Sequence, residues 1–478
     1  MSSFEEMNFV FCPNSIAIIG ASRDTEKEKH QGWTGRLLQF EYRGKIYPIN
    51  PQADYILGLK AYNSIIDIPE KVDYAIISVG AELVPKAVKE CIHKSVKGIH
   101  IFTAGFAETG KEKGKKLQEE IVNIIRNSNT RVIGPNCMGI YCPQSNITFD
   151  TRFSRESGPI AFVSQTGVAG RQFIYTANQR GLRFSKAVSY GNAVDLDSTD
   201  FLEYLARDPE TKLIVLYIEG VRDARRFFEI VRECVKTKPV VILKAGLSES
   251  GAGAVASHTA SLSGSRRVWQ AFFKQTGAIQ VETLDEAVEQ LLALLHIPRL
   301  EGRKAGIVGR GGGPGVIAVD LCEKEGITVP QLMAETRNQL ERITPAEAGS
   351  SVRNPVEVGI GGGGVSKDYA RGLEIVASDP QVDFVITHLN PEGYSHYGGL
   401  GDWQEDLIKM LLSSVKTMPK PLVVVLMPGQ TTETFGPIKE VQQRLTEAGL
   451  PVFSSMEAAT KAVSRVIGYY EFLMSLDK

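Results

Sequence analysis

The sequence predicts an α/β protein built from successive blocks of parallel strands and crossover helices. Two observations predict this fold class. Short β-branched apolar runs are each followed by a turn and a helix-length stretch, which is typical of parallel strands joined by helices. The clearest runs in the first block are SIAIIG (15–20), DYAIISV (73–79) and GIHIFT (98–103).

The second observation is that this pattern restarts twice along the chain. It restarts at GPIAFVSQTG (158–167) and again at RKAGIVGRGGGPG (303–315). We therefore predict three α/β domains, and we place them at 1–150, 151–300 and 301–478.

The second and third blocks also resemble each other, which predicts a duplicated domain. KPVVILKAG (238–246) in the second block matches KPLVVVLMPG (420–429) in the third. After the first of these, the second block has SESGAGAVASHTASLSGS, whereas the third has the shorter QTTETFGPIKE without a histidine. This difference indicates that the stretch in the second block carries residues for catalysis.

The bulk composition limits the classes of partner. Lys and Arg number 54 and Asp and Glu 55, so the formal net charge of -1 gives no field that recruits nucleic acid or an anionic membrane. The six cysteines are too sparse for a disulfide framework and form no zinc motif. No apolar run approaches the roughly 20 residues of a membrane span, and no signal peptide is recognisable. We expect a cytoplasmic protein that binds small molecules and other proteins and holds no metal.

The stretch around His258 is the strongest candidate for chemistry. Its Gly, Ala and Ser side chains are too small for core packing, so we expect a loop between a strand and a helix that starts near Ser265. Such a loop lets the backbone approach a ligand closely and presents one imidazole at the carboxyl edge of a parallel sheet. A neutral imidazole attacks phosphorus, and the resulting N–P bond is labile enough to pass phosphate on. We predict that His258 carries a phosphoryl group.

Such a histidine needs a partner that fixes its tautomer and a pocket for phosphate. Glu219 ends the apolar strand LIVLYIEG, so its carboxylate is expected at the same edge, where it can accept the other ring N–H. The turn after PIAFV opens a helix and is predicted to bind an anion through its backbone N–H groups. Its residues are Ser164, Gln165, Thr166 and Gly167.

The first block ends its first strand in a single-glycine turn rather than a full G-x-G-x-x-G, so NAD binding is poorly supported. Gly20, Ser22 and Arg23 can still bring N–H groups and a cation against a diphosphate. Cys137 has no identifiable base beside it, so we expect a buried or ligand-lining thiol. Further strand ends at the same edge add Asn50, Pro51, Ser78, Val79, Thr103, Ala104, Asn136 and Cys137 as candidate ligand contacts.

Taken together, these motifs resemble the NDP-forming acyl-CoA synthetases, which are relatives of succinyl-CoA synthetase. The resemblance covers essentially the whole chain in the same order, and the combination of GPN-C with SHT is far more specific than either part. The residues that carry it are IIGAS, YPINP (47–51), TAGFAETG (103–110), IGPNCMG (133–139), FVSQTG (162–167), Glu219 and SHTASLSGS (257–265).

The resemblance implies a Rossmann-like CoA-binding domain followed by two flavodoxin-like domains, the middle one carrying the phosphohistidine. The implied reaction interconverts acyl-CoA, NDP and phosphate with acid, CoA and NTP, through an acyl phosphate and phosphorylated His258. Glu219 then holds the imidazole, the turn of Gln165 to Gly167 stabilises phosphohistidine, and Glu108 is a second candidate carboxylate. Nothing after residue 300 resembles an ATP-grasp domain. An ATP-grasp β-type partner chain is therefore expected to bind the Mg-nucleotide in a hetero-oligomer.

Two positions depart from the family pattern, and two other functions stay open. Ala260 stands where the SHTG motif of the family has glycine, and Arg310 lies in the glycine-rich turn of the third block.

The chain could be a CoA-dependent acyl or phosphoryl transferase without nucleotide synthesis, or a non-catalytic CoA sensor. The acyl group is left open among acetate, branched acids and aryl acids.

Overall fold

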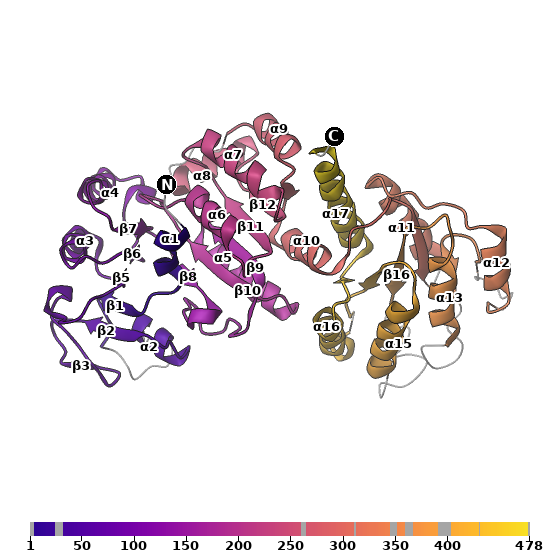
Figure 1. The fold of residues 1–478 in the computed structure, drawn as a ribbon, viewed down its shortest axis with the longest axis horizontal. Coiled ribbons are helices and arrows are strands. Elements are labelled where there is room, and N and C mark those ends of the chain that lie inside the picture. Colours follow the sequence, from indigo (N-terminus) through magenta and orange to yellow (C-terminus); the bar gives the residue numbers. More distant parts are fainter. Residues whose placement is uncertain are drawn as a thin grey trace. The chain divides into compact units, whose positions relative to one another are not determined.

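The computed structural model describes most of the chain, which divides into two compact units. The first unit comprises residues 1–178 and 182–284, and the second comprises 179–181 and 285–478. Figure 1 shows that the sheets of both units are flanked by helices. The described residues are 4–23, 32–259, 264–309, 312–344, 351–358, 367–390, 403–429 and 431–476.

The first sheet of the first unit has five parallel strands. All residues of its first strand are buried, as expected for a strand covered on both faces. In spatial order the strands are β2 (Lys45–Ile49), β1 (Ser15–Ile19), β5 (Tyr74–Ile77), β6 (Gly98–Ile101) and β7 (Arg131–Ile133). The accompanying helices and hairpin are α1 (Phe4–Phe11), α2 (Gly32–Gln39), β3 (Tyr55–Ile56), β4 (Leu59–Lys60), η1 (Ile65–Asp67), η2 (Ala81–Leu83), α3 (Val84–His93), η3 (Ala107–Thr109) and α4 (Glu112–Ile125).

The second sheet of the first unit has six strands, five of them parallel. In spatial order these are β13 (Ile279–Val281), β12 (Val240–Lys244), β11 (Leu213–Ile218), β9 (Ser157–Ser164), β10 (Phe184–Ser189) and β8 (Gly139–Tyr141). The short edge strand β8 pairs antiparallel with β10. The helical elements are η4 (Pro143–Ser145), α5 (Gly167–Gln179), α6 (Ser198–Arg207), α7 (Ala224–Val235), α8 (Glu249–Thr259) and α9 (Arg266–Thr276).

The second unit contains one five-stranded parallel sheet. Its strands, in spatial order, are β15 (Val356–Glu357), β14 (Ala305–Gly309), β16 (Phe384–Leu389), β17 (Leu422–Leu426) and β18 (Val452–Phe453). Its described helices are α10 (Leu284–His296), α11 (Gly312–Lys324), α12 (Ala334–Glu341), α13 (Lys367–Ala377), α15 (Trp403–Thr417), α16 (Thr432–Glu447) and α17 (Met456–Leu476). The prediction of repeated parallel-sheet blocks is confirmed.

The parallel strands of all three sheets follow the same order, 2-1-3-4-5 counted along each block. In this order the connections leave strands 1 and 3 in opposite directions, which opens a crevice at their carboxyl ends where ligands bind. The crevice lies between β1 and β5 in the first sheet, between β9 and β11 in the second and between β14 and β16 in the third. A ligand site at one of these crevices is formed by the loops that follow the two strands beside it.

One local prediction was wrong. The small-residue stretch expected to be a loop forms helix α8 from Glu249 to Thr259, and His258 belongs to its last turn. Alanine is the best helix former, and the hydroxyl of Ser248 accepts a hydrogen bond from Gly251 N at 3.1 Å in the first turn. The following helix begins at Arg266 with Ser265 as its N-cap, as predicted. Ala260 and Arg310 lie outside the described residues.

The predicted domain boundaries at 150 and 300 stay predictions. The strand β8 joins the second sheet although it precedes residue 150.

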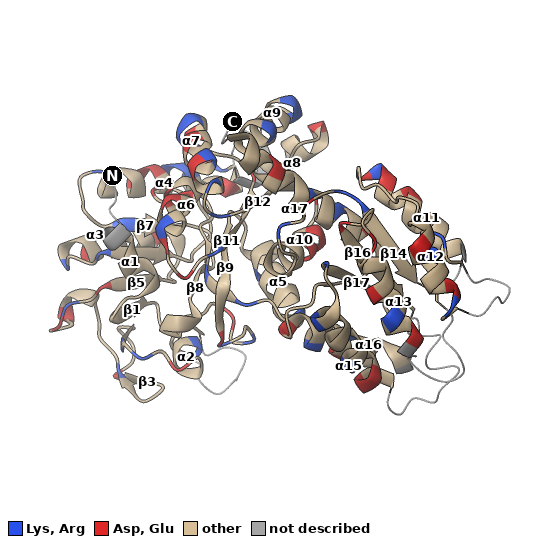
Figure 2. Cartoon of the chain, turned by 45° about the vertical axis from the view of Figure 1, so that its right-hand side comes forward, with Lys and Arg blue, Asp and Glu red and all other residues tan. Residues whose placement is uncertain are grey.

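Basic and acidic residues are interspersed along the helices (Figure 2), in keeping with the near-zero net charge. Among the described helices, none combines the length and the apolar character that crossing a bilayer requires.

Candidate functional site

The carboxyl edge of the first sheet is shaped by Gly20, which directly follows β1. Gly20 has a φ of +90°, and a Cβ there would lie 2.6 Å from Ser78 O and 2.7 Å from Val79 Cγ1. Because both neighbours follow β5, Gly20 lets two turns meet at the crevice between strands 1 and 3. Only glycine permits this approach at a positive φ.

The other predicted loops of this edge join the same arrangement. Asn50 Nδ2 donates to Ala21 O at 2.9 Å, which ties the loop after β2 to the Gly20 turn. Thr103 Oγ1 donates to Val79 O at 2.7 Å, and Asn136 N donates to Thr103 O at 2.9 Å. The structure thus brings together the candidate loops of Gly20 to Arg23, Asn50, Pro51, Ser78, Val79, Thr103, Ala104, Asn136 and Cys137. Their role as CoA contacts stays a prediction.

Cys137 lies beneath this edge and is not arranged as a nucleophile. It is buried, its Sγ lies 3.5 Å from Ile101 O, and burial raises the pKa of its thiol. His100 Nε2 lies 3.2 Å from the Cys137 carbonyl oxygen, and burial lowers the pKa of His100 to about 4. A neutral imidazole, absent from the sequence prediction, therefore supports the loop that carries Asn136.

The first and second sheets meet at their carboxyl edges through the loop after β10. A Cβ at Gly191 would lie 2.3 Å from both Pro135 O and Asn136 O, so this glycine fits directly onto the GPN-C loop. The backbone continues the contact, because Asn192 N donates to Pro135 O and Val194 N donates to Gly134 O, both at 3.0 Å. The two sheets therefore share one edge region.

Glu108 belongs to this junction. Its Oε1 accepts hydrogen bonds from Gly105 N at 2.6 Å and from Phe106 N at 3.0 Å. Its Oε2 accepts from Asn192 Nδ2 at 2.5 Å, so the carboxylate joins a loop of the first sheet to one of the second. Asn192 was missed from the sequence. The one signal for it is a Gly-Asn pair close to the end of a strand.

The second sheet places the predicted phosphate turn and Glu219 on the two sides of its own crevice, after β9 and β11. Gln165 Oε1 accepts hydrogen bonds from Glu219 N at 2.9 Å and from Gly220 N at 3.1 Å. Ser164 Oγ donates to Thr166 O at 2.7 Å. Ser164, Gln165 and Glu219 are buried, and the first two side chains support the turn, so the groups left for the predicted anion are the backbone N–H groups at the start of α5.

Lys244 is a second residue that the sequence analysis missed. It ends β12 and is buried, and its Nζ donates to Glu219 O at 2.7 Å. Burial lowers the pKa of Lys244 to about 8, while the negative charge of Glu219 acts in the opposite direction. The ammonium of Lys244 and the backbone of Glu219 thus lie together beside the predicted phosphate turn.

Helix α8 brings the histidine segment to the same region. It lies against η3, the turn that holds Glu108. The side chain of His258 lies outside the described part of the structure, so its pairing with Glu219 stays a prediction. In the described residues, no group of three or more His, Cys, Asp or Glu side chains is arranged to hold a metal ion.

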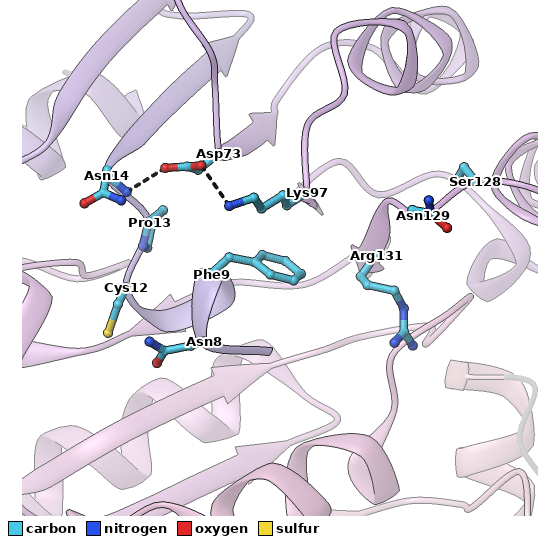
Figure 3. A pocket seen from close by; sticks show the side chains of 10 residues that line it. All are labelled: Asn8, Phe9, Cys12, Pro13, Asn14, Asp73, Lys97, Ser128, Asn129 and Arg131. Carbon is cyan, nitrogen blue, oxygen red and sulfur yellow. Dashed lines mark hydrogen bonds and ion pairs between the residues drawn. The ribbon is translucent and has the colours of Figure 1, made fainter. Parts of the chain in front are cut away.

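A separate pocket of about 760 Å³ lies at the opposite, amino-terminal edge of the first sheet. Figure 3 shows Asp73 between the backbone N–H of Asn14 and the ammonium of Lys97, with hydrogen-bond and ion-pair distances of 3.0 and 3.4 Å. These residues precede strands β1, β5 and β6. The pocket is therefore distinct from the site at the carboxyl edge.

Comparison with known proteins agrees with this geometry. Residues 14–143 match the family model of a CoA binding domain, and residues 157–294 match that of a succinyl-CoA ligase like flavodoxin domain. The chain is 36% identical to the α subunit of the ADP-forming acetate–CoA ligase II of Pyrococcus furiosus, over 96% of this chain and 97% of the relative. The chain belongs to the NDP-forming acyl-CoA synthetases.

Two further relatives of this NDP-forming acyl-CoA synthetase are informative. The ADP-forming acetate–CoA ligase I of Archaeoglobus fulgidus is 37% identical over 99% of this chain, which spans 65% of that relative. An acetyl-coenzyme A synthetase 1 from Ca. Korarchaeum cryptofilum, solved with phosphate and ADP, has a TM-score of 0.83 and 28% identity. The alignment covers 100% of this chain and 99% of that one. The predicted family, fold and acid–thiol ligase class are confirmed.

Proposed function

We propose that this chain is the CoA-binding, phosphohistidine-carrying subunit of an ADP-forming acyl-CoA synthetase. The observation that carries the proposal is the junction of the two carboxyl edges through Glu108 and Asn192, with α8 against the Glu108 turn. Through this junction, loops suited to a thioester, a turn suited to phosphate and the helix that carries His258 all lie in one unit. Family membership supports the same reaction.

The first step takes place at the CoA loops. A phosphate oxygen attacks the thioester carbonyl carbon, the C–S bond breaks, and the CoA thiolate leaves and is protonated. Backbone N–H groups at the start of α5 hold the phosphate, and the Gly20 turn approaches the CoA diphosphate. The product is an acyl phosphate.

The second step transfers the phosphoryl group to His258. One ring nitrogen attacks phosphorus, the P–O bond to the acyl group breaks, and the carboxylate leaves. Glu219 accepts the N–H of the other ring nitrogen and so stabilises the cationic ring. The N–P bond is then cleaved by NDP, which gives NTP and restores the imidazole.

A partner chain supplies the nucleotide site in this proposal. The relative from Archaeoglobus fulgidus is a single chain of which this one spans 65%, whereas the Pyrococcus furiosus relative of matching length is named an α subunit. We infer that an ATP-grasp β-type subunit binds the Mg-nucleotide in a hetero-oligomer. Acetate is the first acid to test, because it is named for both relatives.

Phosphoryl labelling tests the proposal. Acetyl-CoA and ³²P-phosphate are expected to label the wild-type chain with an acid-labile, base-stable phosphate, and His258→Asn is expected to abolish the label. His93→Asn is the matched control, because His93 is exposed at the end of α3, just before β6 begins, and so lies toward the amino-terminal edge of the first sheet. A label that persists in His258→Asn would contradict the assignment of His258 as the phosphorylated residue. ATP formation from acetyl-CoA, phosphate and ADP by the purified chain alone would contradict the requirement for a partner chain.

A further inference from the structure

Lys244 occupies an unusual place for a lysine. It is the last residue of β12, paired in register with Ile218 of β11, and its exposed fraction is 5%. Burial of an ammonium is costly unless the group is satisfied by hydrogen bonds, so a lysine at such a place requires a specific set of acceptors. Those acceptors are all at the carboxyl edge of the second sheet.

The ammonium connects the two chain segments that the proposed chemistry must align. Lys244 Nζ donates to Glu219 O at 2.7 Å and also to Ala245 O, and it lies 5.4 Å from the ring centroid of Trp269. Glu219 lies in the turn after β11, whereas Ala245 begins the segment that leads to α8. One side chain therefore ties the residue before the histidine segment to the turn that holds the carboxylate.

Glu219 is held from both sides as a result. Its N–H donates to Gln165 Oε1 at 2.9 Å, and its C=O accepts from Lys244 Nζ. Both peptide groups of Glu219 are thus fixed, which restricts the directions its side chain can take. Gly246, with a φ of +76°, follows Ala245 and turns the chain toward α8.

We propose that Lys244 is a positioning residue for phosphoryl transfer, which holds the Glu219 turn and the start of the histidine segment in one fixed arrangement. The inference rests on the proposed function, since it concerns the approach of His258 to Glu219. Lys244 acts through these two segments and is assigned no contact with substrate. Small errors in the alignment of reacting groups reduce rates strongly, up to about a hundredfold for a 1 Å displacement.

The segment that leads into the same strand supplies a matched control. Lys238 precedes β12, at the opposite edge of the sheet, and it also donates to two backbone carbonyls, Leu205 O at 2.8 Å and Asp208 O at 2.6 Å. Lys238→Met removes equivalent hydrogen bonds far from the phosphate turn. It therefore reports the cost of losing a hydrogen-bonded ammonium without the loss of alignment at the site.

The experiment compares Lys244→Met and Lys238→Met in the acetyl-CoA and ³²P-phosphate labelling assay. Lys244→Met is expected to lower the rate of phosphoprotein formation at saturating substrates by roughly tenfold or more, with the KM for acetyl-CoA within about twofold of wild type. Lys238→Met is expected to keep the wild-type rate within about twofold. Lys244→Arg, which keeps a cationic donor, is expected to recover part of the rate and serves if the Met variant does not fold.

The outcomes separate the two proposals. A wild-type rate in Lys244→Met, an equal loss in Lys238→Met, or a folded Lys244→Arg that labels no faster than His258→Asn overturns the role of Lys244. In each of these cases the proposed function still stands if the wild-type chain takes the label and His258→Asn does not. A wild-type chain that takes no label, or one that is labelled elsewhere than His258, overturns both.

Discussion

Gly20→Ala tests the prediction that the crevice of the first sheet depends on the close approach of two turns. The new Cβ would lie 2.6 Å from Ser78 O and 2.7 Å from Val79 Cγ1, and Gly20 has a φ of +90°. Gly58→Ala is the matched control, because Gly58 has a φ of +79° in the β3–β4 hairpin and a Cβ added there would meet no atom within 4 Å. Both variants bear the conformational strain, and only the first adds a collision.

The magnitude follows from these two contributions. A left-handed conformation costs an alanine about 1–2 kcal/mol, and a forced contact in a packed region adds about 1–3 kcal/mol. We expect the free energy of unfolding to fall by about 1–2 kcal/mol in Gly58→Ala and by about 2–5 kcal/mol in Gly20→Ala. The affinity for CoA is expected to fall in Gly20→Ala alone, because the Gly20 turn must move away from β5.

Calorimetric unfolding and isothermal titration with CoA measure both effects. The two variants are expected to differ in unfolding temperature and in CoA affinity, with Gly58→Ala close to wild type in affinity. Equal stability losses together with equal CoA affinities would refute the reasoning, since they would mean that the approach of the two turns is not needed for either.

Three further predictions concern the junction and the buried groups. Burial lowers the pKa of His100 to about 4 from its ordinary 6.5. Between these two pH values the unfolded chain therefore binds more protons than the folded chain. The stabilising contribution is complete above about pH 6.5, and about 3 kcal/mol of the free energy of unfolding is lost as the pH falls from there through 4. His100→Phe should flatten this pH dependence in urea unfolding. Glu108→Gln replaces one carboxylate oxygen by an amide donor that faces N–H groups, and we expect a loss of about 1.5–3 kcal/mol and slower acyl phosphate formation, with the exposed Glu112→Gln as control. Gly191→Ala places a Cβ 2.3 Å from Pro135 O and Asn136 O, and we expect about 1–3 kcal/mol of destabilisation and a reduced labelling rate; wild-type values of both would exclude the proposed contact between the sheets.

Much of the candidate site follows from the sequence because its loops follow strands that are readable by their apolar runs. Gly20, Glu219 and the turn at Ser164 each come directly after such a run, and parallel strands align their carboxyl ends. The order of the strands is set by long-range pairing. The positions of the crevices therefore required the structure.

The missed features are those whose meaning depends on distant neighbours. Lys244 extends the apolar run VVIL, and nothing local shows that its ammonium reaches the Glu219 carbonyl. Asn192 is defined by its contact with Glu108, which lies 84 positions earlier. The helical state of α8 was missed for a different reason. Its small residues suggested a ligand-binding loop, although the alanines among them favour a helix.

The backbone pairing between the loop after β10 and the strand end of β7 limits how this enzyme can move. Val194 N and Leu196 N donate to Gly134 O and Val132 O at 3.0 and 3.1 Å, and Arg131 pairs with Asp195 at 2.9 Å. The candidate CoA loops and the loop after β10 are thus tied together by backbone hydrogen bonds and an ion pair within the first unit. Under the proposed function, the movement of a phosphoryl group toward a nucleotide on a partner chain is therefore assigned to the segment that follows Gly246.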